Sequence, residues 1–347
     1  MAVLSSAGTT TRAFLTISPI IRSRFTNFPY PLFHAVDVAH AGIFDGTAVP
    51  PAEMRARLPR VICGVCCYNL IRLMELSNAL LPDGRTVYCV NSYEVDFSAH
   101  EIFGEDLTAH GLRMPSDGVF VDVGANIGLF SLRIADVCPN AKIFAFEPMP
   151  AAFAALERNV SEFAPSAQAF RIGLGAAPGT AEFDYYPAIT ALSTCNSATG
   201  NELAGGIRKL LFNQQPGEAM ERILDKTGVT DLREETDFAE RLFRVEKVDA
   251  TIDTFSNQVA ALGIDWIDLL KIDTEGNEKE VLAGIREEDW GKIRQLLVEV
   301  HLGREEMEHI AEDLHRRGFE ITIGDHPMAQ GGASVFHIYA KRTTAAQ

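Results

Sequence analysis

The most regular pattern of apolar and polar positions lies between residues 118 and 148. An apolar run over 119–123 ends in a glycine-containing turn, 124–128, and apolar residues at helical spacing follow it. A second apolar run, 143–146, stops at Glu147, about 20 residues beyond the turn. This order predicts the βαβ unit of a nucleotide-cofactor site, with an acidic side chain placed to bind a ribose.

The alternation of apolar strands and amphipathic helices continues beyond this unit. We expect strands at 119–123, 142–146, 168–174, 266–272 and 296–300, and helices at 127–137, 150–163 and 305–317. This alternation predicts an α/β fold with a doubly wound, mostly parallel sheet that is covered on both faces. Two last runs, 319–324 and 335–340, flank a glycine-rich turn and predict a C-terminal antiparallel hairpin; 180–186 indicates an added strand.

The segments outside this core have different patterns. Residues 37–82 are amphipathic at helical spacing and precede a short strand at 86–90, so we expect 37–100 to form an N-terminal helical cap on a core domain at 101–345. An insertion, 187–245, interrupts the alternation with two amphipathic helical segments, 218–226 and 231–243. Long insertions in compact domains are usually functional or disordered, and we favour a helical lid over the acceptor pocket rather than a dimer contact.

The first 36 residues contain no Asp, Glu or Lys but carry three arginines and many serines and threonines. This composition suits a flexible tail or an organellar transit peptide. We favour the tail and therefore a cytoplasmic protein, with an organelle as the alternative.

Charge and cysteine content narrow the range of partners. The formal net charge is −16 and no Lys/Arg cluster occurs, which argues against a nucleic acid or an anionic membrane as partner. A small-molecule or carrier-bound acceptor fits better, and a homodimer is possible. Cys63, Cys66 and Cys67 lack a second pair at zinc spacing and are expected on the apolar face of a helix, which suggests a reducing compartment.

The glycine turn discriminates between cofactors. Its pattern D-x-G-x-N-x-G is formed by Asp122, Gly124, Asn126 and Gly128. A dinucleotide dehydrogenase requires a second glycine where Asn126 stands. A carboxylate and an amide near the turn suit the amino-acid tail of S-adenosyl-L-methionine, whose ribose would reach Glu147. A nicotinamide-dependent oxidoreductase and a catalytically silent cofactor-binding protein are the alternatives.

Acidic residues and a histidine follow the predicted strands 266–272 and 296–300. Strands 119–123 and 266–272 would be neighbours, so we expect the side chains after these strands to converge on an acceptor. We predict that Asp273, Glu275 or His301 removes a proton from an acceptor hydroxyl. Asp273, Glu299 and His301 suit a divalent cation as an alternative, but their spacing does not require one and no metal is assigned. Glu101 and Glu105, one helical turn apart, are expected on a solvated face.

Four segments, VFVDVGANIGLFSL, IFAFEPMPAAFAALERNV, IDLLKIDTEGNEKEVLAGI and LLVEVH, resemble in that order the motifs of the FkbM-like methyltransferases. The resemblance covers about residues 101–301 and implies a class I methyltransferase with a Rossmann-like fold that uses S-adenosyl-L-methionine and mostly methylates oxygen. It implies cofactor roles for Asp122, Gly124, Asn126, Gly128 and Glu147, and a reaction face at Asp273, Glu275 and His301. From this resemblance we expect O-methylation of a small-molecule, natural-product or sugar hydroxyl. Thr274, Asn277 and the insertion depart from the family pattern, so the resemblance does not identify the acceptor.

Overall fold

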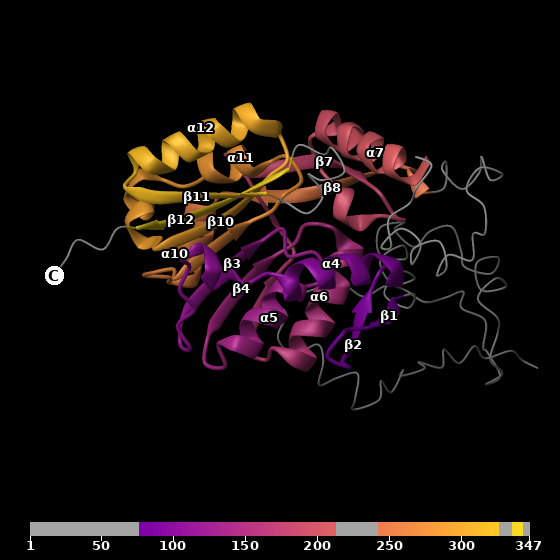
Figure 1. Cartoon of the computed structure of the whole chain (residues 1–347), viewed down its shortest axis with the longest axis horizontal. Helices are drawn as coiled ribbons and strands as arrows, with labels where there is room; N and C mark the ends of the chain where they lie inside the picture. Colours follow the sequence, from indigo (N-terminus) through magenta and orange to yellow (C-terminus); the bar gives the residue numbers. More distant parts are fainter. Residues whose placement is uncertain (1–75, 213–241, 326–334, 343–347) are drawn as a thin grey trace, which may run out of the picture. The chain divides into compact units, whose positions relative to one another are not determined.

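The computed structural model describes residues 76–212, 242–325 and 335–342 (Figure 1). All of these residues belong to one unit of the chain, residues 62–347. The first 36 residues, most of the predicted cap and nearly all of the two predicted insertion helices lie outside the described residues. None of the described helices is long and apolar enough to cross a membrane.

A seven-stranded sheet forms the centre of the domain, in the order β11-β12-β10-β9-β3-β4-β5. Its strands are β3 (Val119–Val123), β4 (Lys142–Phe146), β5 (Ala167–Phe170), β9 (Leu269–Ile272), β10 (Gln295–Val300), β11 (Phe319–Asp325) and β12 (Phe336–Arg342). The pairs among β5, β4, β3, β9 and β10 are parallel, whereas β12 runs antiparallel between β10 and β11. The predicted doubly wound, mostly parallel sheet with a C-terminal antiparallel hairpin is confirmed, and so is the predicted pairing of β3 with β9.

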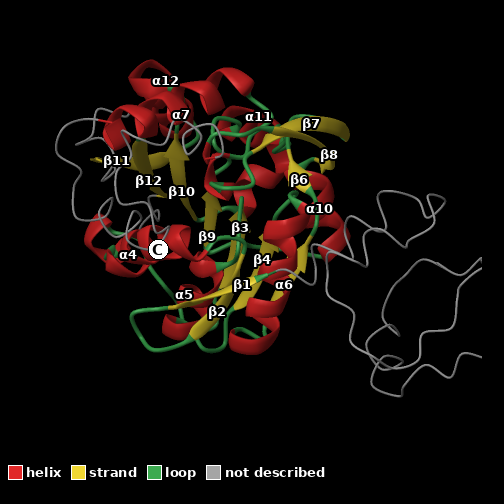
Figure 2. Cartoon of the chain, turned by 90° about the vertical axis from the view of Figure 1, so that its right-hand side faces the viewer, coloured by secondary structure: helices red, strands yellow, loops and turns green. Residues whose placement is uncertain are grey.

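Helices cover both faces of this sheet because its strands are apolar on both sides. Val121 belongs to the core beneath α10 (Phe255–Leu262), α11 (Glu278–Ala283) and α12 (Gly303–Arg316). Phe120, on the opposite side of β3, packs against α5 (Leu129–Val137). Figures 1 and 2 show α11 and α12 on one side of the sheet, and α4 (Ser92–Gly104), α5 and α6 (Pro150–Phe163) on the other.

Two smaller sheets, three short 3-10 helices and helix α7 complete the described structure. Strand β8 (Glu246–Asp253) lies between β6 (Gly173–Leu174) and β7 (Gly179–Tyr185), and β1 (Ser77–Leu80) pairs with β2 (Thr86–Cys89). The remaining elements are η1 (Leu107–His110), η2 (Thr190–Leu192), α7 (Ser197–Phe212) and η3 (Glu287–Lys292).

The structure corrects several predicted elements. Residues 77–80, predicted as helix, form β1 because the turn before β2 allows an antiparallel pairing that overrides the helical spacing. The single strand predicted over 168–174 is divided between β5 and β6, which belong to different sheets. Strand β9 begins at Leu269 instead of residue 266, helix α4 extends beyond the helical cap predicted at 37–100, and helix α7 was not predicted.

The turn after β3 brings the ends of two strands into close contact. Gly124 has a φ of 80°, and a Cβ there would lie 1.7 Å from the carbonyl oxygen of Asp273, which follows β9. Gly128 has a φ of 91° and precedes α5, where a Cβ would lie 2.7 Å from Leu156 Cδ1 on α6. Both glycines are therefore required by sterics as well as by backbone conformation.

We predict that Gly124→Ala lowers the free energy of unfolding by about 3 kcal/mol or more, because the added methyl group meets the backbone of Asp273. Urea unfolding followed by circular dichroism measures the change. Gly291→Ala is the matched control, since nothing lies within 4 Å of its position. Equal loss of stability in the two variants would contradict the close approach of the two strand ends.

Candidate active site

A cavity of about 990 Å³ opens at the carboxyl ends of the central strands. Residues after β3, β4, β9 and β10 line it, together with parts of α4 and the loop before α7. Ligands of doubly wound sheets bind at this edge, and the volume is sufficient for a cofactor and part of an acceptor.

The glycine turn and Glu147 form one side of the cavity. Gly124 and Asn126 line it, and Glu147 follows strand β4. The Glu147 carboxylate accepts hydrogen bonds from the backbone N–H groups of Asn126, at 2.9 Å, and Met149, at 2.8 Å. Burial raises the pKa of Glu147 to about 7. The turn and the acidic residue therefore lie together, as the sequence predicted.

Asp122 precedes this turn and Gly128 ends it, and neither residue lines the cavity. The Asp122 side chain is fully buried and accepts a hydrogen bond of 2.7 Å from the Ser131 hydroxyl on α5. Asp122 thus joins β3 to the helix that follows the glycine turn. The cofactor role predicted for Asp122 stays a prediction, and any such role would act through the turn and α5.

Glu94 on α4 is a cavity residue that the sequence did not reveal. Its carboxylate accepts hydrogen bonds from Asn91 Nδ2, at 3.0 Å, and from the Thr190 hydroxyl, at 3.1 Å. Burial raises the pKa of Glu94 to about 7. Thr190 also lies 3.4 Å from Asn126 Oδ1, so Glu94 is connected to the glycine turn.

Lys271 on β9 connects this side of the cavity to the opposite one. The side chain is buried, with Nζ 2.7 Å from Asp273 Oδ2 and 4.0 Å from Asp122 Oδ1. Burial alone would lower the pKa of Lys271, but the two carboxylates raise it well above its usual value. The ammonium therefore remains charged and balances both carboxylates.

The turn after β9 has strained backbone at Glu275, whose φ is 51°, and Gly276 follows with a φ of 94°. Glu278, fully buried at the start of α11, accepts hydrogen bonds from the backbone N–H groups of Gly276, at 2.9 Å, and Thr274, at 3.3 Å. A non-glycine residue at positive φ is retained where the surroundings enforce it, often at a functional site. This turn places Asp273 and Glu275 on the cavity wall.

His301 lies between three carboxylates. Its Nε2 is 3.2 Å from Glu275 and 3.3 Å from Glu299, and its Nδ1 is 3.1 Å from Glu278. Burial alone would lower the pKa of His301, but these carboxylates raise it well above its usual value. Burial also raises the pKa of Glu275, although His301 opposes the shift.

A histidine that keeps its proton at neutral pH cannot accept another one. The surrounding carboxylates favour the protonated form of His301, and which of Asp273, Glu275 and His301 acts as the base stays a prediction. Asp273 and Glu275 remain as the carboxylates available to an acceptor.

Glu101 and Glu105 also line the cavity, instead of the solvated face that the sequence indicated. The Tyr339 hydroxyl donates a hydrogen bond to Glu105, which fixes this end of α4 against β12. The spacing of the two glutamates was visible in the sequence, but the docking of α4 on the sheet was not.

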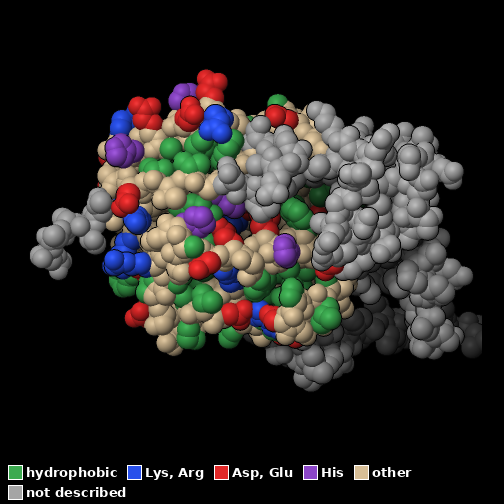
Figure 3. All heavy atoms as spheres, in the orientation of Figure 1, with side chains coloured by type: hydrophobic (Ala, Val, Ile, Leu, Met, Phe, Trp, Pro, Cys, Tyr) green, Lys and Arg blue, Asp and Glu red, His purple; other side chains and the backbone are tan. Residues whose placement is uncertain are grey.

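Charges of both signs are mixed over the face shown in Figure 3, where red acidic side chains and purple histidines also occur near the centre. Among the described residues of this face there is no continuous Lys/Arg surface. The expectation that neither nucleic acid nor membrane is a partner stays a prediction.

The sequence was compared with known protein families, and one of them matches most of the part of the chain that forms the central sheet and the cavity. The family described as Methyltransferase FkbM domain matches residues 122–321, which include the glycine turn, Glu147 and the Asp273–His301 region. The chain belongs to the FkbM methyltransferase family. It is therefore a member of a family of methyltransferases, and such enzymes in general use S-adenosyl-L-methionine.

Three proteins of similar sequence illustrate the relationship. The 31-O-demethyl-FK506 methyltransferase FkbM of Streptomyces tacrolimicus is 31% identical over 267 residues, which cover 76% of this chain and 96% of that protein. Methyltransferase sdnD of Sordaria araneosa is 32% identical, covering 69% of this chain and 88% of that protein. The AMB antimetabolite synthetase AmbE of Pseudomonas aeruginosa is 33% identical over 76% of this chain, but the match spans only 12% of AmbE.

The buried carboxyl group of Glu147 predicts a pH dependence of stability. Its pKa is about 7 in the folded protein against 4.5 for an ordinary Glu, so the folded state keeps a proton that the unfolded state releases. Stability should therefore fall as pH rises from 4.5 to 7, by about 3 kcal/mol for this group.

Urea unfolding of the wild type and of Glu147→Gln at pH 5 and pH 8 measures this dependence. The wild type should lose more stability than Glu147→Gln, while exposed Glu157→Gln on α6 should follow the wild type. Identical pH dependence in wild type and Glu147→Gln would mean that Glu147 is not buried as described.

Proposed function

We propose that this chain transfers the methyl group of S-adenosyl-L-methionine to an acceptor hydroxyl. The observation that carries the proposal is one continuous cavity with two chemically different ends. One end has the glycine turn and Glu147, which suit a nucleoside, and the other has the carboxylates Asp273 and Glu275, which suit proton removal.

The cofactor end matches the charges of S-adenosyl-L-methionine. The Glu147 oxygens each receive one backbone hydrogen bond, which leaves lone pairs to accept the two ribose hydroxyls. Glu94 is connected to the turn through Thr190, and this supports a role for it in binding the ammonium group of the amino-acid tail. A cofactor with a sulfonium and an ammonium group suits these two buried acids better than a dinucleotide with its pyrophosphate does.

The acceptor end supplies a base for the transfer. The acceptor oxygen attacks the methyl carbon as the carbon–sulfur bond breaks, which leaves neutral S-adenosylhomocysteine. The proton of the acceptor hydroxyl passes to Asp273 or Glu275. The name of one relative, 31-O-demethyl-FK506 methyltransferase, supports oxygen as the atom that is methylated. It does not identify the molecule that this chain methylates.

Calorimetric titration with S-adenosylhomocysteine tests the cofactor end. We expect the wild type and the exposed control Glu157→Gln to bind it equally, and Glu147→Gln to bind it at least tenfold more weakly because glutamine offers the ribose one acceptor oxygen instead of two. NAD should not bind. Binding of NAD in place of S-adenosylhomocysteine would favour the oxidoreductase alternative.

Transfer of a labelled methyl group to hydroxylated acceptors in a host extract tests the other end. Asp273→Asn or Glu275→Gln should lower turnover about 100-fold while the affinity for S-adenosylhomocysteine stays unchanged. Cofactor binding without transfer to any acceptor would favour a catalytically silent binding protein. Full turnover in both variants would remove these carboxylates from the mechanism.

A further inference from the structure

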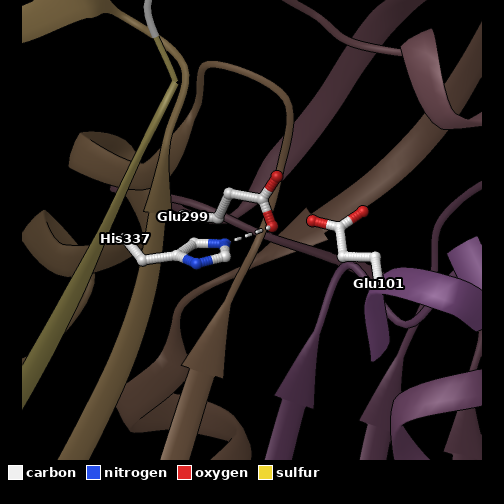
Figure 4. A group of neighbouring side chains, drawn as sticks. All are labelled: Glu101, Glu299 and His337. Carbon is white, nitrogen blue, oxygen red and sulfur yellow. Dashed lines mark ion pairs between the residues drawn. The ribbon is translucent and has the colours of Figure 1, made fainter. Parts of the chain in front are cut away.

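The acceptor end of the cavity contains a second group of ligand-type side chains, Glu101, Glu299 and His337, next to the group around His301. Their nearest carboxylate and imidazole atoms all lie within 4.8 Å of one another. Figure 4 shows the Glu101 and Glu299 carboxyl groups and the His337 ring converging from α4, β10 and β12. All three residues line the cavity.

The fold places Glu299 and His337 together by strand register. The two residues are direct partners in the antiparallel pairing of β10 with β12, so their side chains lie on the same face of the sheet. His337 Nε2 is 3.4 Å from Glu299 Oε2. Neighbouring octahedral ligands, each about 2.1 Å from a cation, lie about 3 Å apart. The Glu299 and His337 side chains would therefore need to move only slightly to bind one cation together.

A second observation concerns the orientation of the His337 ring, whose side chain is buried. His337 Nδ1 is 3.1 Å from the Tyr339 hydroxyl, and that hydroxyl donates its hydrogen to Glu105. The hydroxyl can therefore only accept from His337, which means that Nδ1 carries a hydrogen. Metal-binding histidines are commonly held in this way by an outer hydrogen bond, which turns the other nitrogen toward the ion.

The neighbouring group Asp273, Glu299 and His301 is less suited to a cation. Lys271 already lies 2.7 Å from Asp273, and both ring nitrogens of His301 are within 3.3 Å of glutamate oxygens. The Lys271 ammonium therefore already balances Asp273, one of the three candidate ligands of that group. Glu299 belongs to both groups, with one oxygen toward His301 and the other toward His337.

We propose that Glu101, Glu299 and His337 bind one divalent cation at the acceptor end of the cavity. Two carboxylates and one imidazole are a ligand set suited to Mn²⁺ or Fe²⁺, whereas Ca²⁺ prefers more oxygen ligands. The remaining coordination positions face the cavity. If the proposed O-methylation holds, the cation binds the acceptor oxygen and lowers the pKa of its hydroxyl, whose proton then passes to Asp273 or Glu275.

Titration of the metal-free full-length protein with Mn²⁺ alone tests the site, with bound ion measured by electron paramagnetic resonance. We expect one Mn²⁺ per chain and a loss of affinity of at least tenfold in Glu101→Gln and in His337→Ala. His309→Ala, which changes an exposed histidine on α12, should bind as the wild type does. Asp273→Asn should change the affinity less than threefold.

Absence of Mn²⁺ binding by the wild type would overturn the proposal. So would loss of binding in Asp273→Asn while Glu101→Gln and His337→Ala bind normally, since the ion would then lie at the other group. Unchanged binding of S-adenosylhomocysteine shows that the variants are folded. Mn²⁺ binding without any methyl transfer would support the cation site and reject the proposed function. Full methyl transfer without Mn²⁺ binding would support the proposed function and reject the cation site.

Discussion

The arrangement of the site depends on one buried positive charge, the Lys271 ammonium between Asp122 and Asp273. Lys271 and Asp122 are direct partners in the pairing of β9 with β3, so the charge lies where the two central strands meet. Asp122 holds α5 through Ser131, and Asp273 begins the turn that carries Glu275. Without the ammonium, two acidic side chains would lack their counter-charge, and because Asp122 is fully buried the cost would be several kcal/mol. The 124–128 turn and the turn that begins at Asp273 are thereby held together.

The pKa values of the acidic groups and of the histidine in the cavity are raised by different causes. Glu94 and Glu147 lie close to backbone and hydroxyl donors, and burial raises the pKa of each to about 7. His301 is surrounded by carboxylates that keep its proton in place. A positively charged ligand beside Glu94 or Glu147 would lower the pKa of that carboxyl group, because an opposite charge favours the ionised form.

Local sequence determines the part of the site formed by the β3 turn, α5 and Glu147. Long-range packing determines the part formed by α4, β10 and β12. The β3 turn, α5 and Glu147 were predictable because glycine spacing and apolar periodicity act over about 30 residues. Glu94 and Glu101 were not, because their positions depend on how α4 docks on the sheet. The proximity of His337 to Glu299 follows from antiparallel register between strands distant in sequence. His301 was found by its place after a strand, but its charge required the three surrounding carboxylates.

The most direct test of this account is a crystal structure of the full-length protein with S-adenosylhomocysteine. We predict the ribose hydroxyls within hydrogen-bonding distance of Glu147, the amino-acid tail beside the 124–128 turn, and the sulfur facing Asp273 and Glu275. A ligand bound outside this cavity, or one whose ribose lies away from Glu147, would contradict the assignment of the site.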